Sequence, residues 1–235
     1  IAWNGADARM VLDAYRGFSA AAPRELTSVA VLRIAPPAPW LPKEVHGKPI
    51  AAIFVCHTGS AEAGEAALAP LRKCGRPVAD IVKQRPYTQM QSLLDATQPK
   101  GRRYYWKSHY LAGIAPDLVQ QALDHADRIP SAHSAILLFQ IQGALGELPA
   151  GHSPAGNRDA AYVLNIAGSW ERPEDDAVNV HWARACFDAT RPFSTGGTYV
   201  NFLTDEEGPD RIEAAYGRTI LQRLAALKRQ YDPDD

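Results

Sequence analysis

The chain has 235 residues and a formal net charge of −1, and 46% of its residues are hydrophobic. This length is enough for one well-packed core, or for one domain with an appendage. The charge argues against a nucleic-acid partner, because no basic stripe is available to neutralise phosphates. No apolar run approaches the roughly 20 residues needed to span a bilayer, so we expect no membrane partner either.

Cysteine and histidine usage excludes further classes. Cys56, Cys74 and Cys186 are scattered and form no C-x-x-C pair, so we expect free thiols and a reducing compartment. No signal peptide is visible, which adds to the expectation of a cytoplasmic protein. The seven histidines show none of the spacings typical of zinc ligands, so we expect no metal site.

Hydrophobic periodicity predicts alternating helices and strands along the first part of the chain. Predicted helices cover 6–22, 60–73 and 87–96, and predicted strands cover 26–35 and 50–57. Ser60 is the expected cap of the second helix, with its hydroxyl bound to a free backbone N–H. The proline-rich segment 36–49 interrupts both patterns and predicts a loop.

The second part of the chain continues the alternation and ends in a long helical pattern. Predicted strands cover 102–111, 135–141, 160–167 and 198–203, and predicted helices cover 116–128, 175–190 and 209–230. An apolar stripe on the last helix needs a surface to pack against: Ile212, Tyr216, Ile220, Leu224 and Leu227. Strands separated by helices, without an internal repeat, indicate an α+β sandwich with one sheet face free to meet a ligand.

One stretch combines a turn signal with side chains suited to chemistry. Gly196 and Gly197 permit a sharp turn, and the β-branched and aromatic residues after them predict a short strand. In a strand, Tyr199 and Asn201 project to the same side and form a plausible ligand-facing pair. An ordinary strand with a half-buried tyrosine is the alternative.

An ordered set of motifs over nearly the whole chain resembles one enzyme family. The motifs are Pro36-Pro37-Ala38-Pro39, Val45-His46-Gly47-Lys48-Pro49, Arg103-Tyr-Tyr-Trp-Lys-Ser108, Arg158-Asp-Ala-Ala-Tyr162, Arg191-Pro-Phe-Ser194, Gly196-Gly-Thr-Tyr-Val-Asn-Phe202, Ala215-Tyr216-Gly217 and the run 224–233. In this order they are similar to the C-terminal part of berberine-bridge-enzyme-like FAD-linked oxidases, which are flavoproteins of the vanillyl-alcohol-oxidase type.

The resemblance implies a fold and a division of the chain. Residues 1–203 are expected to form an α+β substrate domain, a large, mainly antiparallel sheet with helices on one face and the flavin on the other. Residues 204–235 are expected to be a C-terminal segment, with a helix that belongs to the FAD-binding domain. Nothing in the chain resembles that N-terminal domain, and the chain opens at Ile1 rather than Met. We therefore expect a fragment that by itself lacks FAD and activity.

The resemblance also implies roles for single residues. Tyr199 is the expected catalytic base and Asn201 the expected flavin contact. Val163 and Asn165 share one strand face with Ala167, which relatives use for substrate. Some relatives place a carboxylate on this strand to activate the tyrosine, where this chain has Ala167 and Gly168. For Asn165, a satisfied polar residue of the sheet is the alternative.

Two glutamines on the preceding strand complete the candidate site. Gln140 and Gln142 share a face by their spacing and could hydrogen-bond a polyol substrate, although plain solvated residues are the alternative.

The chain is expected to be the C-terminal part of an FAD-dependent oxidoreductase that removes a hydride from an alcohol, a sugar or a similar small molecule. The expected partners are the substrate, the missing FAD domain and a second copy bound through exposed apolar surface. A self-standing α+β small-molecule-binding module without redox activity is the alternative.

Overall fold

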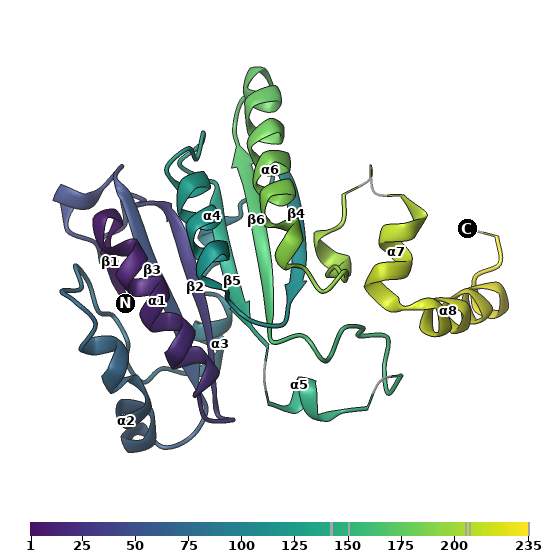
Figure 1. The fold of residues 1–235 in the computed structure, drawn as a ribbon, viewed down its shortest axis with the longest axis horizontal. Helices are drawn as coiled ribbons and strands as arrows, with labels where there is room; N and C mark the ends of the chain where they lie inside the picture. Colours follow the sequence, from purple (N-terminus) through teal and green to yellow (C-terminus); the bar gives the residue numbers. More distant parts are fainter. Residues whose placement is uncertain (142, 150, 205, 207, 235) are drawn as a thin grey trace.

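The computed structural model describes residues 1–141, 143–149, 151–204, 206 and 208–234. Within them, six strands form one sheet in the order β1-β3-β2-β5-β6-β4, and every neighbouring pair is antiparallel (Figure 1). The strands are β1 (Ala2–Asn4), β2 (Leu26–Ile34), β3 (Pro49–His57), β4 (Arg103–Leu111), β5 (Ala135–Gln140) and β6 (Tyr162–Trp170). The large antiparallel sheet expected from the sequence is confirmed.

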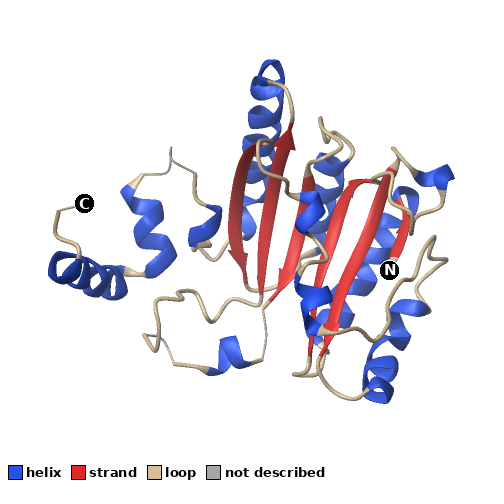
Figure 2. Cartoon of the chain, turned by 180° about the vertical axis from the view of Figure 1, so that it is seen from behind, coloured by secondary structure: helices blue, strands red, loops and turns tan. Residues whose placement is uncertain are grey.

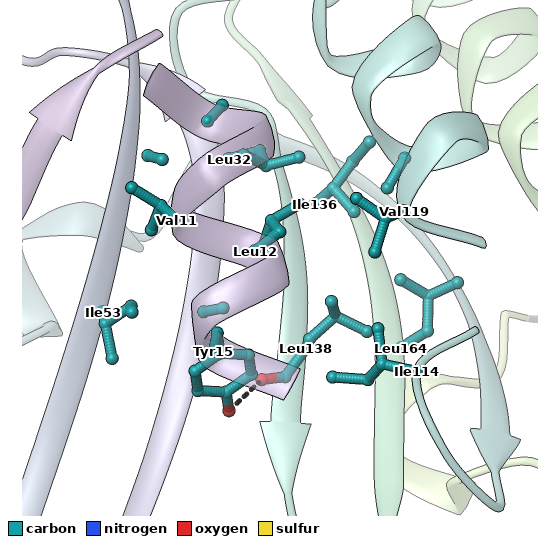
Figure 3. Packing of buried hydrophobic residues seen from close by; sticks show 14 of the residues in the cluster. Val11, Leu12, Tyr15, Leu32, Ile53, Ile114, Val119, Ile136, Leu138 and Leu164 are labelled. Carbon is teal, nitrogen blue, oxygen red and sulfur yellow. Dashed lines mark hydrogen bonds between the residues drawn. The ribbon is translucent and has the colours of Figure 1, made fainter. Parts of the chain in front are cut away.

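Helices cover one face of this sheet. They are α1 (Ala8–Ala20), α2 (Ala61–Arg72), α4 (Pro116–Ala126) and α6 (Asp176–Thr190). The main core lies between these helices and the sheet, and Figure 3 shows Leu12 and Tyr15 of α1 facing Leu138 of β5. We call the opposite side of the sheet the open face; Figure 2 views the chain from behind.

Strand β6 illustrates how the alternation of side chains builds both faces. Tyr162, Leu164 and Ile166 point toward the helices and belong to the main core. Val163 and Asn165 point to the open face, yet both are also buried. Every residue of β6 is buried, because strands flank it on both sides and side chains cover both faces.

Two smaller apolar clusters cover parts of the open face. Leu41 and Val45 from the proline-rich loop pack on Ile50 and Ala52 of β3. At the other end of the sheet, Phe202 packs against a cluster made of Tyr110, Ala160 and Val163 with Phe139 and Ile141. The open face is therefore apolar at both ends.

The predicted elements agree with the structure to within a few residues in most places. The Ser60 cap is confirmed, since the backbone N–H of Ala63 donates to its hydroxyl at 3.2 Å. The predicted helix 87–96 is instead α3 (Tyr87–Gln91) followed by a 3₁₀ turn at Asp95–Thr97. Strand β1 was not predicted because three residues are too few for periodicity to detect. A short helix, α5 (Ala144–Glu147), interrupts the expected loop between β5 and β6.

The single helix predicted over 209–230 is wrong, because the structure has two helices there. They are α7 (Pro209–Tyr216) and α8 (Arg218–Tyr231), separated by Gly217 at a φ of 77°. A positive φ ends a right-handed helix and is readily adopted by glycine. Helix α7 buries Ala215, whereas α8 buries none of its residues. Figure 1 shows both helices lying to one side of the sheet.

Candidate active site

The segment 194–203 runs along the outer edge of β4. Ser194 bridges to Leu111, and the N–H of Thr195 donates to the carbonyl of Tyr110 at 2.9 Å. The N–H of Tyr110 in turn donates to the carbonyl of Gly197 at 3.3 Å. These contacts hold the Gly-Gly turn against the sheet and place the following residues at the open face.

The strand predicted over 198–203 is wrong. Val200–Phe202 forms a 3₁₀ turn, in which the N–H of Phe202 donates to the carbonyl of Tyr199 at 2.9 Å. The β-branched and aromatic composition favoured a strand. Packing decides otherwise, because the ring of Phe202 lies edge-on to Trp106 of β4 with ring centroids 5.4 Å apart.

The two glycines of this segment are required for different reasons. Gly196 has a φ of 93°, which other residues rarely adopt. A Cβ on Gly197 would collide with the side chain of Asn157. Asn157 itself has a φ of 53°, and its Nδ2 donates to the carbonyls of Ala214 and Ala215 at 3.1 and 3.3 Å. Asn157 thus ties the Gly-Gly turn to the C-terminal end of α7.

Tyr199 and Asn201 lie together as predicted, although in a turn rather than a strand. The Nδ2 of Asn201 donates to the phenol oxygen of Tyr199 at 2.8 Å. The rings of Tyr199 and Phe202 are arranged edge-on with centroids 5.0 Å apart, and Tyr199 is 36% exposed. A phenol oxygen and a carboxamide are therefore both available to a ligand at the open face.

Hydrogen bonds from β4 and α7 fix the start of this turn. The hydroxyls of Ser108 and Thr198 are 3.0 Å apart, and the N–H of Tyr199 donates to Ser108 Oγ at 3.4 Å. A guanidinium nitrogen of Arg211 donates to Thr198 Oγ1 at 3.0 Å and to the Ser108 carbonyl at 3.2 Å. Arg211 could not be identified from the sequence, because nothing in its spacing connects it with β4.

Aromatic and apolar side chains form the floor of the site. Phe139 lies 6.2 Å from Phe202 between ring centroids, and Val163 is buried in the same cluster. The indole Nε1 of Trp106 is buried and has no hydrogen-bond partner among the described residues. A buried donor without a partner is costly, so Trp106 is a place where a bound ligand could supply an acceptor.

Asn165 lies directly beside the anchoring hydrogen bonds. It is paired with Ser108 across the β4–β6 ladder and is 3% exposed. Its Nδ2 donates to the carbonyl of Lys107 at a long 3.4 Å. The predicted face of Val163 and Asn165 is the open face, and their roles in substrate binding stay predictions.

Gln140 does not lie where the sequence analysis expected. It points to the helix-covered face, where its Nε2 donates to the carbonyl of Ser19 at 2.7 Å and its Oε1 accepts from Ser28 Oγ at 2.5 Å. Both ends of the carboxamide are engaged and the residue is 5% exposed. The prediction that Gln140 contacts the substrate is therefore wrong, because the residue lies on the other side of the sheet. Gln142 lies outside the described residues.

An ion cluster connects the acidic loop after the site with β4 and α6. Glu206 accepts from Lys107 Nζ at 2.9 Å and also binds Arg184 and the hydroxyl of Tyr105. Burial acts to raise the pKa of Glu206, but the hydrogen bonds from Tyr105, Lys107 and Arg184 outweigh it and lower the pKa to about 2. These contacts join residues on the two sides of the domain boundary predicted between residues 203 and 204. The boundary itself stays a prediction.

His109 is buried on the helix-covered face of β4, behind the candidate site. Its ring stacks on Phe187 with centroids 4.1 Å apart, and Nε2 lies 3.0 Å from the Phe187 carbonyl. Burial, helped by the positive charges of Arg211 and Arg191, lowers the pKa of His109 to about 4. Nothing in the sequence around His109 indicated this burial.

Two classes of feature are missing from the described part of the chain. No helix there is long and apolar enough to cross a membrane. Within the same residues, His, Cys, Asp and Glu side chains form no group of three or more that could hold a metal ion.

Comparisons with known proteins give similarities to FAD-linked enzymes. Residues 198–235 match the family model described as berberine and berberine like. The chain is 25% identical over 183 residues to an FAD-linked oxidoreductase of Dictyostelium discoideum, covering 77% of this chain and 39% of that protein. It is also 25% identical over 197 residues to (R)-6-hydroxynicotine oxidase of Paenarthrobacter nicotinovorans, covering 80% of this chain and 42% of that protein. The chain thus spans about two fifths of the length of these relatives.

Solved structures share the fold over the whole chain. A berberine-bridge-enzyme-like protein of Physcomitrella patens superposes with a TM-score of 0.76 at 14% identity, over 99% of this chain and 50% of that one. The 6-hydroxy-D-nicotine oxidase of Arthrobacter nicotinovorans gives a TM-score of 0.73 at 19% identity, over 100% of this chain and 51% of that one. Together with the sequence matches, they confirm the resemblance to berberine-bridge-enzyme-like FAD-linked oxidases.

Proposed function

We propose that this chain is the substrate-binding part of an FAD-dependent oxidoreductase that removes a hydride from an alcohol, a sugar or a similar small molecule. The observation that carries the proposal is the hydrogen-bonded pair of Tyr199 and Asn201 at the open face, above an aromatic floor. The similarity to FAD-linked oxidoreductases supports it. Activity is assigned to the whole protein rather than to these 235 residues alone.

The residues of the open face fit a flavin. A flavin ring needs an apolar surface and polar groups for its edge, and Trp106, Phe139 and Phe202 provide the surface. The unpartnered Nε1 of Trp106 is one donor for such an edge, and Asn201 is the second polar group. When bound, FAD supplies the acceptor for the electron pair that leaves the substrate carbon.

Tyr199 is proposed to accept the proton that leaves the substrate hydroxyl or amine. The residue is partly exposed, and it accepts the proton in its phenolate form, which becomes the neutral phenol; the amide N–H of Asn201 stabilises the negative charge of that phenolate before the transfer. The Tyr199 backbone N–H donates to Ser108 Oγ and Arg211 donates to Thr198 Oγ1, and these bonds fix the start of the turn, so the phenol oxygen is held in position.

Val163 and Asn165 are proposed to contact the substrate from the sheet. Val163 contributes apolar surface next to Phe139, and Asn165 lies opposite Ser108 on the same face. Ala167 stands at the next position on this face and carries no carboxylate to activate Tyr199. Asn201 is the only hydrogen-bond donor to the phenol among the described residues, so we assign the support of Tyr199 to it.

The uncovered helix α8 is proposed to pack on the FAD-binding part of the same protein. Ile212 and Leu227 on α7 and α8 are 40% and 51% exposed, and α8 buries no residue of its own. Apolar stripes of this kind stabilise a protein when another surface covers them. A second copy of the chain is the competing occupant, and the mass of the purified protein in solution separates the two.

The proposal is tested on the whole protein that contains this chain. We expect a yellow protein whose visible flavin absorption is bleached under anaerobic conditions by at least one member of a panel of alcohols, sugars and hydroxylated N-heterocycles. A colourless protein that binds a member of the panel in calorimetry would instead establish a binding module without redox chemistry. If the flavin of Tyr199→Phe is bleached at the wild-type rate, Tyr199 is not the proton acceptor.

A further inference from the structure

A cavity of about 900 Å³ lies along the β3 side of the sheet. Its walls include Phe54 and Cys56 from the open face of β3, Tyr87 and Met90 from α3, and Trp40 from the proline-rich loop. The volume is typical of small-molecule sites, which are mostly apolar with a few polar groups. None of its lining residues belongs to the segment 194–203.

One part of the cavity wall carries a cluster of basic side chains. Arg33 lies near the end of β2, Arg102 immediately precedes β4, and His133 precedes β5. The Arg102 side chain is only 14% exposed. Arg33 and Arg102 line the same cavity, and burial, followed by the positive charge of Arg102, lowers the pKa of Arg33.

The acidic groups nearby do not balance this charge. Glu171 lies 3.8 Å from Arg102 and 3.2 Å from His133, but its side chain is 66% exposed. Within the described residues, Arg33 forms no ion pair with an acid; its donors bind only the backbone carbonyls of Ile34 and Ala132. With one carboxylate against two guanidinium groups, an excess positive charge remains in a partly buried place.

The remaining charged side chains of the cavity add to this excess. Lys83 and Arg85 also line it. Glu65, the acidic residue in the lining, forms an ion pair with Arg72. Burial, followed by the charge of Arg102, lowers the pKa of His133, so His133 is a neutral hydrogen-bonding group at neutral pH.

We propose that this cavity binds a small organic carboxylate, with its apolar body against Phe54, Trp40 and Met90 and its carboxylate on Arg33 and Arg102. Guanidinium groups are suited to carboxylates because their donors match the two oxygens. A carboxylate offsets the positive charge that Glu171 leaves on Arg33 and Arg102. The site goes beyond the proposed oxidoreductase function and does not depend on FAD.

The test uses calorimetric titration of the whole protein that contains this chain with decanoate, and with decyltrimethylammonium as a cation of equal chain length. Decanoate is expected to bind at least about tenfold more tightly than the cation, and its affinity should fall as sodium chloride is raised. Arg102→Gln and Arg33→Gln should each weaken decanoate binding about tenfold or more. Arg172→Gln is the matched control, because Arg172 is exposed, pairs with Asp175 and does not line the cavity.

Each outcome decides the matter. Equal affinity for decanoate and the cation, or wild-type affinity in a folded Arg102→Gln variant, would overturn the proposal. If both variants lose their cooperative melting transition, the salt dependence of the wild-type chain decides instead, and a flat dependence counts against the site. If decyl phosphate binds more tightly than decanoate, the basic cluster is a phosphate site and the carboxylate proposal is overturned. Because these measurements report carboxylate binding and not flavin reduction, their failure leaves the oxidoreductase proposal standing.

Discussion

The carboxamide of Asn201 donates a hydrogen bond to the phenol oxygen of Tyr199 at 2.8 Å. The bond spans two residues of one 3₁₀ turn, so the two side chains keep their relative position whenever the turn is formed. A phenol takes up a proton only as its phenolate, and the N–H of Asn201 is placed to stabilise that anion. The proposed chemistry therefore depends on both members of the pair.

Replacement of Tyr199 by Phe removes the proton acceptor and leaves the ring in place. In the whole protein we expect kcat for substrate oxidation to fall about 10²- to 10⁴-fold with little change in KM. Anaerobic stopped-flow measurement of flavin bleaching checks this. Tyr104→Phe is the matched control on the same face, because its hydroxyl donates to the Pro99 carbonyl at 2.6 Å. A comparable loss in the control would show that the effect is not specific to Tyr199.

A double-mutant cycle tests whether Asn201 acts through Tyr199. Asn201→Ala alone should lower kcat about tenfold, because the phenol oxygen loses its donor. In the Tyr199→Phe background the same change should cost little, since there is no oxygen left to support. Rate constants for flavin reduction in the four proteins measure this coupling. Full additivity would mean that Asn201 acts on the cofactor or substrate directly.

The hydrophobic periodicity of the sequence was sufficient to predict most of the helices and strands. In β6, the alternation of Leu164 and Ile166 with Val163 and Asn165 predicted two faces, and the structure has these pairs on opposite sides. The capping signal at Ser60 placed the start of a helix to the residue. These features depend on neighbours in sequence, which is why sequence reasoning finds them.

Features that depend on distant contacts could not be predicted in the same way. Period 2 groups Gln140 with a face of β5, but only the docking of α1, with Ser19, determines that this face is covered. Local composition favoured a strand at 200–202, but packing of Phe202 on Trp106 selects a turn. Gly217 was a visible signal for a break between α7 and α8, although glycine is also tolerated within helices.

The contact between Gly197 and Asn157 makes a prediction about stability. Gly197→Ala should lower the free energy of unfolding by about 1–3 kcal/mol, because the new Cβ displaces the Asn157 side chain from its carbonyl partners. Urea unfolding of the 235-residue chain measures the change. Adding Asn157→Gly to the same chain removes the collision, so the double variant should lose less than the sum of the two single changes.

Gly17→Ala is the control for the glycine substitution itself. Gly17 lies in α1 with nothing within 4 Å of the position of a Cβ. Alanine there should be neutral or stabilising by up to about 1 kcal/mol, because alanine favours a helix interior more than glycine does. A Gly197→Ala variant as stable as wild type would contradict the close approach of Asn157.

The buried His109 predicts how stability depends on pH. The pKa of His109 is about 4 in the folded protein and has an ordinary value of 6.5. Between these values the unfolded chain binds a proton that the folded chain does not, so stability falls as pH falls from about 6.5 to 4. The loss from this one residue should reach about 3 kcal/mol at pH 4 and change little below that.

His109→Phe should flatten the pH dependence of urea-unfolding free energies measured between pH 7 and 4.5, whereas His181→Gln, at an exposed site on α6, should not. Equal slopes in wild type and His109→Phe would mean that His109 is protonated in the folded protein.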